Sequence, residues 1–193
     1  MFNCLVKVSI PILVDGIFMK KISIKVPLGD KRSNLWGFHF RIPEEVAIKF
    51  KNGKDRRIIA TFNNQIKNHC AIMPSYEGPF IMLNKQLVQQ LNIEEGDLVA
   101  IQIEKDNSEF GMPICEEFEA VILGDKEVFN HFKRLTPGKQ RNLIHLVNKI
   151  KSPDIKMIRS MAIAHHLMEA KGKLEFKQLN NTIKEFNQRN NLT

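Results

Sequence analysis

The 6 histidines and 3 cysteines of this chain are candidates for metal ligation and for acid-base or nucleophilic chemistry. His165 and His166 are neighbours on a predicted helix, where their side chains point about 100° apart, so they cannot share one ion as an i, i+4 pair does. Cys70 follows His69 in a predicted strand, and successive strand side chains point to opposite faces, which separates a nucleophile from its base. The chain contains no H-E-x-x-H, no G-x-S-x-G and no phosphate-binding glycine-rich loop. We therefore predict no catalytic residue, no metal site and no cofactor, and we expect the protein not to be an enzyme.

Basic residues could instead contact an anion, because lysine and arginine release counterions when they neutralise phosphates. One candidate group lies at a predicted turn: Lys49, Lys51, Lys54, Arg56 and Arg57. A second group lies on two predicted helices: Lys139, Arg141, Lys149, Lys151, Lys156 and Arg159. No aromatic residue that would stack on a base alternates with this second group. A solvated surface is the more frequent role of such side chains, so we favour it over nucleic-acid binding.

A short loop is the candidate for a pocket. Residues 73–79 hold the only tyrosine of the chain, Tyr76, together with Ser75 and Glu77, between two prolines. Loops on a rigid scaffold often carry function, which makes these three side chains candidate pocket residues. A rigid crossover between two halves of a domain explains the prolines and the glycine equally well, and we favour that structural role.

Two copies of one pattern must position these residues. Residues 38–62 and 79–103 each read as a strand, a short helix, a glycine-containing turn and a strand. Pro43 in the first copy and Asn84 in the second fit the start of the helix. Residues 22–26 alternate apolar and polar side chains, as a half-buried strand does. Because such a unit cannot bury its apolar face alone, two copies in one chain predict a single closed β-barrel.

The last third of the chain predicts helices. Thr136 before Pro137 and Ser152 before Pro153 each combine an N-cap with a proline in the first turn. The predicted fold class is therefore α+β. The predicted organisation is an extra strand and turn at residues 1–18, a β-barrel at 19–105, a connection at 106–124 and a helical segment at 125–190.

The charge of the chain is unevenly distributed along the sequence. The net charge is +8, and residues 1–124 contain 15 basic and 15 acidic residues, whereas residues 125–193 contain 14 and 6. The positive excess therefore lies in the predicted helical segment, and electrostatic attraction of a partner would act there.

Composition also bounds the environment of the protein. A length of 193 residues with 43% hydrophobic residues is enough for a folded core. Three widely spaced cysteines predict no disulfide framework, which is typical of a reducing cytoplasm. The apolar stretch at residues 8–18 is interrupted by Asp15 and is too short to span a bilayer, so we expect no membrane insertion.

Several segments resemble known protein families. Residues 83–101 resemble the half-unit of the AbrB/MazE-type swapped-hairpin barrel, which in those proteins is completed by a second chain. Residues 22–167 are similar to a bacterial domain-of-unknown-function family with a double-split β-barrel followed by a helical segment of the YdeI/OmpD-associated, bacteriocin-protection type. This resemblance is carried by residues 36–48, 71–74, 80–85, 95–97 and 132–141. It implies a small double-split, AbrB-like β-barrel that is built from two pseudo-repeats of one chain.

The resemblance also implies a function. We expect a non-catalytic cytoplasmic binding protein, associated with antimicrobial-peptide or envelope stress, whose partner is an unidentified protein or small molecule. The alternative is an AbrB-like nucleic-acid-binding transcriptional regulator, in which the basic residues of the barrel would contact the nucleic acid.

Overall fold

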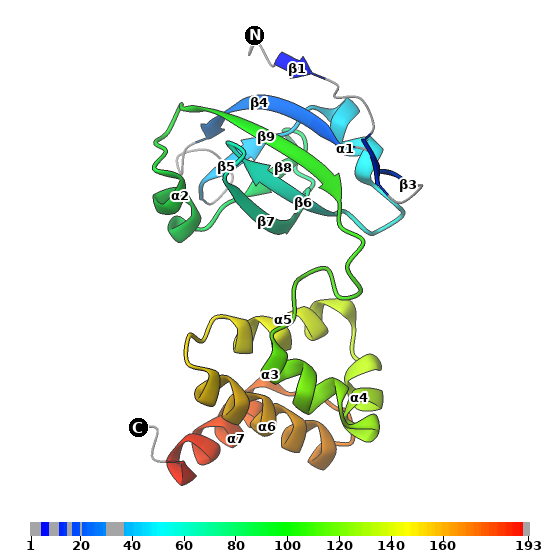
Figure 1. Cartoon of the computed structure of the whole chain (residues 1–193), viewed down its shortest axis with the longest axis vertical. Helices are drawn as coiled ribbons and strands as arrows, with labels where there is room; N and C mark the ends of the chain where they lie inside the picture. Colours follow the sequence, from blue (N-terminus) through cyan, green and yellow to red (C-terminus); the bar gives the residue numbers. More distant parts are fainter. Residues whose placement is uncertain (1–4, 8–11, 15–16, 20, 30–36, 191–193) are drawn as a thin grey trace. The chain divides into compact units, whose positions relative to one another are not determined.

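A computed structural model divides the chain into two compact units, residues Met1–Asn107 and Ser108–Thr193 (Figure 1). It describes residues 5–7, 12–14, 17–19, 21–29 and 37–190. Strands build the first unit, with two short helices, and helices build the second, so the chain is an α+β protein as predicted. Among the described residues, no helix is long and apolar enough to cross a membrane.

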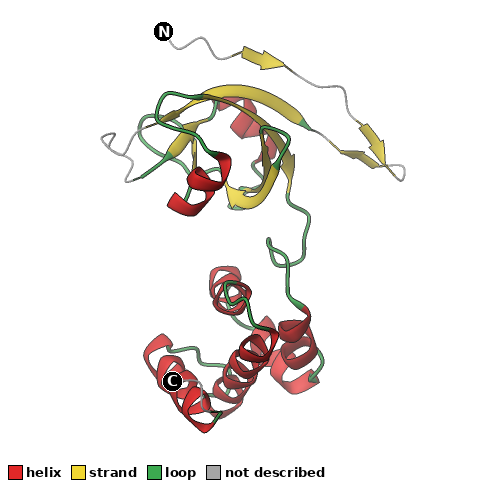
Figure 2. Ribbon diagram, turned by 60° about the vertical axis from the view of Figure 1, so that its left-hand side comes forward, coloured by secondary structure: helices red, strands yellow, loops and turns green. Residues whose placement is uncertain are grey.

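The first unit contains a nearly closed, barrel-like antiparallel sheet (Figure 2). Its six strands are β4 (Ile22–Gly29), β5 (His39–Arg41), β6 (Arg57–Phe62), β7 (Ile66–Ala71), β8 (Phe80–Met82) and β9 (Leu98–Lys105). They follow one another in the order β7-β6-β9-β4-β5-β8. At the remaining gap, Met73 and Phe80 exchange backbone hydrogen bonds of 2.7 and 2.9 Å. This bridge connects the end strands and gives the sheet its barrel-like form.

Strand β4 pairs with different neighbours along different parts of its length. Its residues 22–27 pair with β9, and Leu28 and Gly29 pair with β5, so one strand serves both sides of the barrel. Ile22, Ile24 and Val26 point into the core, as the predicted alternation requires, and each is almost fully buried. Leu28 continues this inward row. The sequence pattern of residues 22–26 is thus confirmed as a half-buried strand.

The two sequence copies form corresponding elements that pair with each other. The first is β5, α1 (Glu44–Phe50) and β6, and the second is β8, α2 (Lys85–Leu91) and β9. Strand β5 pairs with β8, and β6 pairs with β9. The Asn84 side chain caps α2 by accepting a hydrogen bond of 2.7 Å from the Leu87 amide. The prediction that both copies contribute to one sheet is confirmed.

Three further strands precede the barrel. Strand β1 (Leu5–Lys7) pairs with β4, and β2 (Ile12–Val14) forms a hairpin with β3 (Ile17–Met19). These strands lie in the segment for which the sequence predicted an extra strand and turn. Residues 1–4, 8–11 and 15–16 of that prediction, and Trp36 of the family resemblance, lie outside the described residues.

The second unit is a helical bundle with its own apolar core. Its helices are α3 (Glu116–Phe118), the π-helical turn η1 (Glu119–Leu123), α4 (Lys126–Lys133), α5 (Pro137–Asn148), α6 (Pro153–Glu169) and α7 (Phe176–Arg189). Thr136 and Ser152 cap α5 and α6 through hydrogen bonds to Lys139 N and Ile155 N, which confirms the predicted start signals. Gly172, at φ +78°, follows the end of α6 in a conformation that suits glycine.

The segment predicted as a connection contributes to the helical unit. Phe118 and Ile122 in α3 and η1 are fully buried, and Phe110 is nearly so. The Phe118 and Phe132 rings meet edge to face, with centroids 5.5 Å apart. A short helix with only two buried positions carries too little periodicity to be recognised from sequence. The chain from Ser108 onward therefore packs with the helices.

This boundary changes the distribution of charge. Four carboxylates of residues 108–124 now belong to the helical unit: Glu109, Glu116, Glu117 and Glu119. Residues 1–107 carry 15 basic and 11 acidic residues, and residues 108–193 carry 14 and 10, so each unit has a net charge of +4. The expectation that the whole positive excess lies in the helices is therefore wrong for the folded units.

Candidate functional site

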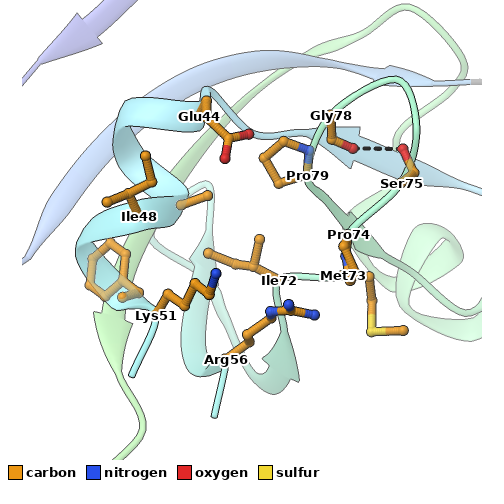
Figure 3. Close-up of a pocket in the computed structure, with 12 residues that line it drawn as sticks. Glu44, Ile48, Lys51, Arg56, Ile72, Met73, Pro74, Ser75, Gly78 and Pro79 are labelled. Carbon is orange, nitrogen blue, oxygen red and sulfur yellow. Dashed lines mark hydrogen bonds between the residues drawn. The ribbon is translucent and has the colours of Figure 1, made fainter. Parts of the chain in front are cut away.

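A hollow of about 200 Å³ lies in the barrel unit between α1 and the loop that joins β7 to β8 (Figure 3). We call it the α1 hollow, and residues 73–79 the crossover loop. Helix α1, the turn that follows it and the crossover loop supply its walls. The two sides of the hollow come from segments that are distant in sequence, and backbone hydrogen bonds from Ile42 N to the Pro79 carbonyl (2.9 Å) and from Ile72 N to the Arg56 carbonyl (3.1 Å) join them.

The floor and the walls of the hollow are apolar. Ile72 and Phe50 are buried beneath it as part of the barrel core. Ile48 on α1 is 61% exposed and Met73 on the crossover loop is 46% exposed, and both line the hollow. Apolar surface left in water costs about 25 cal/mol per Å², and a ligand that covers these two side chains recovers that free energy. The hollow is therefore suited to an apolar group.

Charged side chains stand at opposite ends of the hollow. Glu44 lies at one end beside Pro79, and Lys51 and Arg56 lie at the other end near Ile72 (Figure 3). Within the described part of the chain, none of the three side chains forms an ion pair or hydrogen bond. The two ends therefore offer unpaired charges of opposite sign.

A tight turn holds Lys51 and Arg56 in place. Asn52 and Asp55 exchange two backbone hydrogen bonds of 2.9 Å between them. Lys105 of β9 contacts the Asp55 carboxylate at 2.5 Å. Burial opposes ionisation of Asp55, but hydrogen bonds from Lys105 and from the Arg57 amide outweigh it and lower the pKa of this carboxyl. Asp55 therefore stays charged at neutral pH and keeps the turn fastened to the barrel.

Arg41 of β5 holds the crossover loop from the other side. Its guanidinium donates a hydrogen bond of 3.1 Å to Ser75 Oγ and pairs with the Glu77 carboxylate. Ser75 Oγ in turn donates to the Gly78 carbonyl at 2.6 Å. Gly78 has φ +104°, a conformation that side chains rarely adopt. The loop is thus shaped before any ligand arrives.

The three predicted pocket residues have different fates. Ser75 lines the α1 hollow. Tyr76 is fully exposed at the tip of the crossover loop and does not line the hollow. Glu77 does not line the hollow either, and its carboxylate forms an ion pair with Arg41. The hollow lies beside the loop that the sequence singled out, and its opposite wall, α1, was not foreseen because only the folded barrel brings it there.

Of the predicted basic contacts on the barrel, Arg56 lines the hollow together with Lys51. Lys49 and Lys54 are exposed outside it. Arg57 lies half-buried at the start of β6. The group therefore surrounds one turn, but only part of it faces the hollow.

Residues 25–103 match the family described as a domain of unknown function, DUF1905. The matched segment contains α1, the crossover loop and therefore the whole α1 hollow. Neither a curated protein nor a solved structure matches the chain. The match supports the predicted resemblance of the barrel to a family of unknown function, and DUF1905 itself carries no activity to transfer.

A second depression in the DUF1905-matched segment, of about 480 Å³, lies beside α2. The carboxylate of Asp97, at the edge of this depression, stabilises the turn by accepting a 2.7 Å hydrogen bond from the Glu94 amide. No lysine or arginine lines it. We therefore place the candidate site at the α1 hollow.

The predicted basic residues of the helical unit take part in several internal contacts. Lys139 Nζ donates to the Leu174 carbonyl at 3.4 Å, and Lys156 lies 3.7 Å from the Glu117 carboxylate. Arg159 is half-buried on α6, where burial lowers the pKa of its guanidinium. Arg141 is half-buried and Lys149 and Lys151 are exposed. Their contact with a nucleic acid or another anion stays a prediction.

The structure also pairs a histidine that sequence spacing left alone. His69 Nδ1 lies 3.0 Å from the buried Asp106 carboxylate, a residue 37 positions away. Burial raises the pKa of the neighbouring Cys70 to about 12, so this thiol stays protonated at neutral pH. Among the described residues, no three potential metal ligands gather at one point.

Proposed function

We propose that the protein is a non-catalytic binding protein that holds its ligand in the α1 hollow of the barrel unit. The observation that carries this proposal is the combination of exposed Ile48 and Met73 with unpaired charges at both ends of one preformed hollow. Binding sites combine mostly apolar walls with a few placed polar groups, and this hollow has that composition. Its small volume suits a small ligand or part of a larger one.

The finer identity follows from the resemblance. We propose that the barrel is of the double-split, AbrB-like type and that the helical unit is of the YdeI/OmpD-associated type. The protein would then act in the cytoplasm, in protection against antimicrobial peptides or envelope stress. The nearly closed antiparallel sheet, in which the two copies pair with each other, supports the barrel part of this proposal.

A fragment screen by protein-observed NMR on the full chain tests the binding function. We expect fragments that shift the amide signals of α1 and of the crossover loop. Ala47→Phe should abolish these shifts, because Ala47 lines the hollow and a phenyl ring would fill it. Gln86→Phe is the matched control, since Gln86 is an exposed position of the corresponding helix α2 outside the hollow. Shifts that persist in Ala47→Phe, or the lack of any binding fragment, would reject the proposal.

A second candidate function is nucleic-acid binding by an AbrB-like regulator. It is favoured by the net charge of +4 on residues 1–107 and by four basic residues around one turn: Lys49, Lys51, Lys54 and Arg56. Binding of DNA and RNA should then weaken steeply as salt rises. The double variant Lys49→Gln, Lys54→Gln should reduce that salt dependence and leave fragment binding intact, because neither residue lines the hollow. A lack of binding at low salt would remove this candidate.

A further inference from the structure

We propose that the α1 hollow selects short zwitterionic peptides of about three residues, with the amino group at Glu44 and the terminal carboxylate at Lys51 and Arg56. This inference rests on the proposed binding function and names its ligand class. It is carried by the order of charges along the hollow, by the distance between them and by the apolar surface that separates them.

The charges are spaced for such a ligand. Glu44 begins α1 and Lys51 follows its last residue, and at about 1.5 Å of helical rise per residue the two positions are roughly 10 Å apart. No ion pair joins the two side chains in the described part of the chain. An extended peptide advances roughly 3.3–3.6 Å per residue, so about three residues bring its two termini to the two ends.

Because the two ends of the hollow carry opposite charges, they exclude ligands whose charges all have the same sign. A long-chain carboxylate bound at Lys51 and Arg56 would place its uncharged tail beside the Glu44 carboxylate and leave that charge partly desolvated without a partner. A polyanion such as a nucleic acid would bring a phosphate to the same carboxylate. A ligand with a cation at one end and an anion at the other satisfies all three side chains.

The middle of the hollow requires an apolar side chain. Ile48, Ile72 and Met73 surround the space between the charged ends, with Pro79 on the side of Glu44 (Figure 3). A volume of about 200 Å³ lies below the roughly 300–1,000 Å³ of pockets that enclose drug-sized molecules, so it holds one medium-sized side chain and leaves the peptide backbone partly in water.

One wall and one end of the hollow are fixed in advance. Arg41 holds the crossover loop, and the contact between Lys105 and Asp55 holds the turn that carries Lys51 and Arg56. A preformed site loses less conformational entropy on binding, which lets a small, weakly buried ligand be recognised.

The test compares four probes on the full chain by calorimetry and NMR titration. The probes are alanyl-leucyl-alanine, its N-acetylated form, its C-terminal amide and the doubly capped peptide. We expect the free peptide to bind best, with each cap weakening it about fivefold, the effect of losing one partly solvated ion pair. In Glu44→Gln the acetyl cap should cost nothing further, and in Lys51→Gln, Arg56→Gln the amide cap should cost nothing further.

Matched variants separate this effect from a general change of surface charge. Glu45 is exposed beside Glu44 but does not line the hollow, and Lys49 stands in the same relation to Lys51. Glu45→Gln and Lys49→Gln should therefore leave the order of the four peptides unchanged.

The outcomes distinguish the two proposals. Equal binding of the acetylated and free peptides, or of the amide and free peptides, would overturn the inference that the hollow recognises both charged termini. If fragments occupy the hollow and no peptide binds, the peptide inference fails and the binding function stands. If neither fragments nor peptides bind, both fail.

Discussion

Removal of the Arg41 guanidinium should loosen the crossover loop without unfolding the barrel. Arg41 lies at the end of β5 and joins this strand to Ser75 and Glu77. In Arg41→Gln the loop loses these two contacts and the 3.5 Å hydrogen bond from Arg41 to the Gly78 carbonyl, whereas the core residues beneath it keep theirs. We therefore expect a local effect on the loop.

The size of the effect follows from the exposure of the contacts. The Arg41 and Glu77 side chains are 34% and 45% exposed, so solvent screens their ion pair to about 0.2–1 kcal/mol. The hydrogen bond to Ser75 adds about 0.5–1.5 kcal/mol. A total of about 0.7–2.5 kcal/mol makes opening of the loop roughly 3- to 70-fold more frequent. Affinity for a hollow ligand falls only in proportion to the closed population that is lost.

Amide hydrogen exchange at Gly78 measures this opening directly, because its N–H donates to the Ser75 carbonyl at 3.2 Å. Arg41→Lys, which keeps the charge but lacks the planar fork, should give an intermediate rate. Arg56→Gln is the control, since Arg56 lines the hollow but its side chain forms no hydrogen bond or ion pair with the described loop residues. A Gly78 exchange rate in Arg41→Gln close to that of the wild type would refute the reasoning, as would a matching loss of global stability.

Three further predictions concern burial. Phe118→Ala should destabilise the helical unit by about 3–5 kcal/mol in chemical unfolding followed by region-resolved hydrogen exchange, because it empties a fully buried ring site, and Phe118→Leu should cost less. A change of only a few tenths of a kcal/mol in the free energy of unfolding would mean that α3 is a connection and not part of the helical core. Burial lowers the pKa of His166 below 6.5, and this exceeds the opposing effect of Glu175. Below about pH 6.5 the unfolded chain therefore binds a proton at His166 that the folded chain does not bind, so the free energy of unfolding should fall as the pH drops. Urea unfolding of His166→Phe should lack this part of the pH dependence. Cys70 and Cys115 are both half-buried, and burial raises the pKa of both thiols, that of Cys70 to about 12. Cys70 should therefore react with iodoacetamide more slowly than Cys115 at mildly alkaline pH and readily once urea unfolds the barrel; fast labelling of Cys70 in the folded protein would contradict its raised pKa.

The elements that the sequence predicted well depend on short-range signals. The alternation at residues 22–26, the Asn84 cap and the caps at Thr136 and Ser152 each act within a few residues of the backbone that they specify. The two strand-helix-strand copies could be recognised for the same reason. Where a signal was short, as for the three residues of α3, the prediction assigned the segment to a connection instead.

The candidate site shows the opposite case. Ser75 and Arg56 were singled out from sequence for separate reasons, the first in a loop and the second in a basic turn, and nothing in their spacing placed them in one hollow. The role of Arg41 was missed, since a single arginine in a strand carries no signal for the loop it will hold. The same applies to His69 and Asp106, which are 37 residues apart.

The sequence by itself determined the local elements, the α+β class and the presence of two pairing copies. The reason is that backbone propensity, capping and the alternation of buried and exposed side chains depend on residues that are close together in the sequence. Tertiary structure decided which side chains became a site. Folding of the barrel placed the crossover loop against α1 through the backbone hydrogen bonds of Ile42 with Pro79 and of Ile72 with Arg56. It left Ile48 and Met73 exposed beside one hollow that Glu44, Lys51 and Arg56 also line. Contacts between distant segments depend on how the whole core packs, and that is a property of the folded chain.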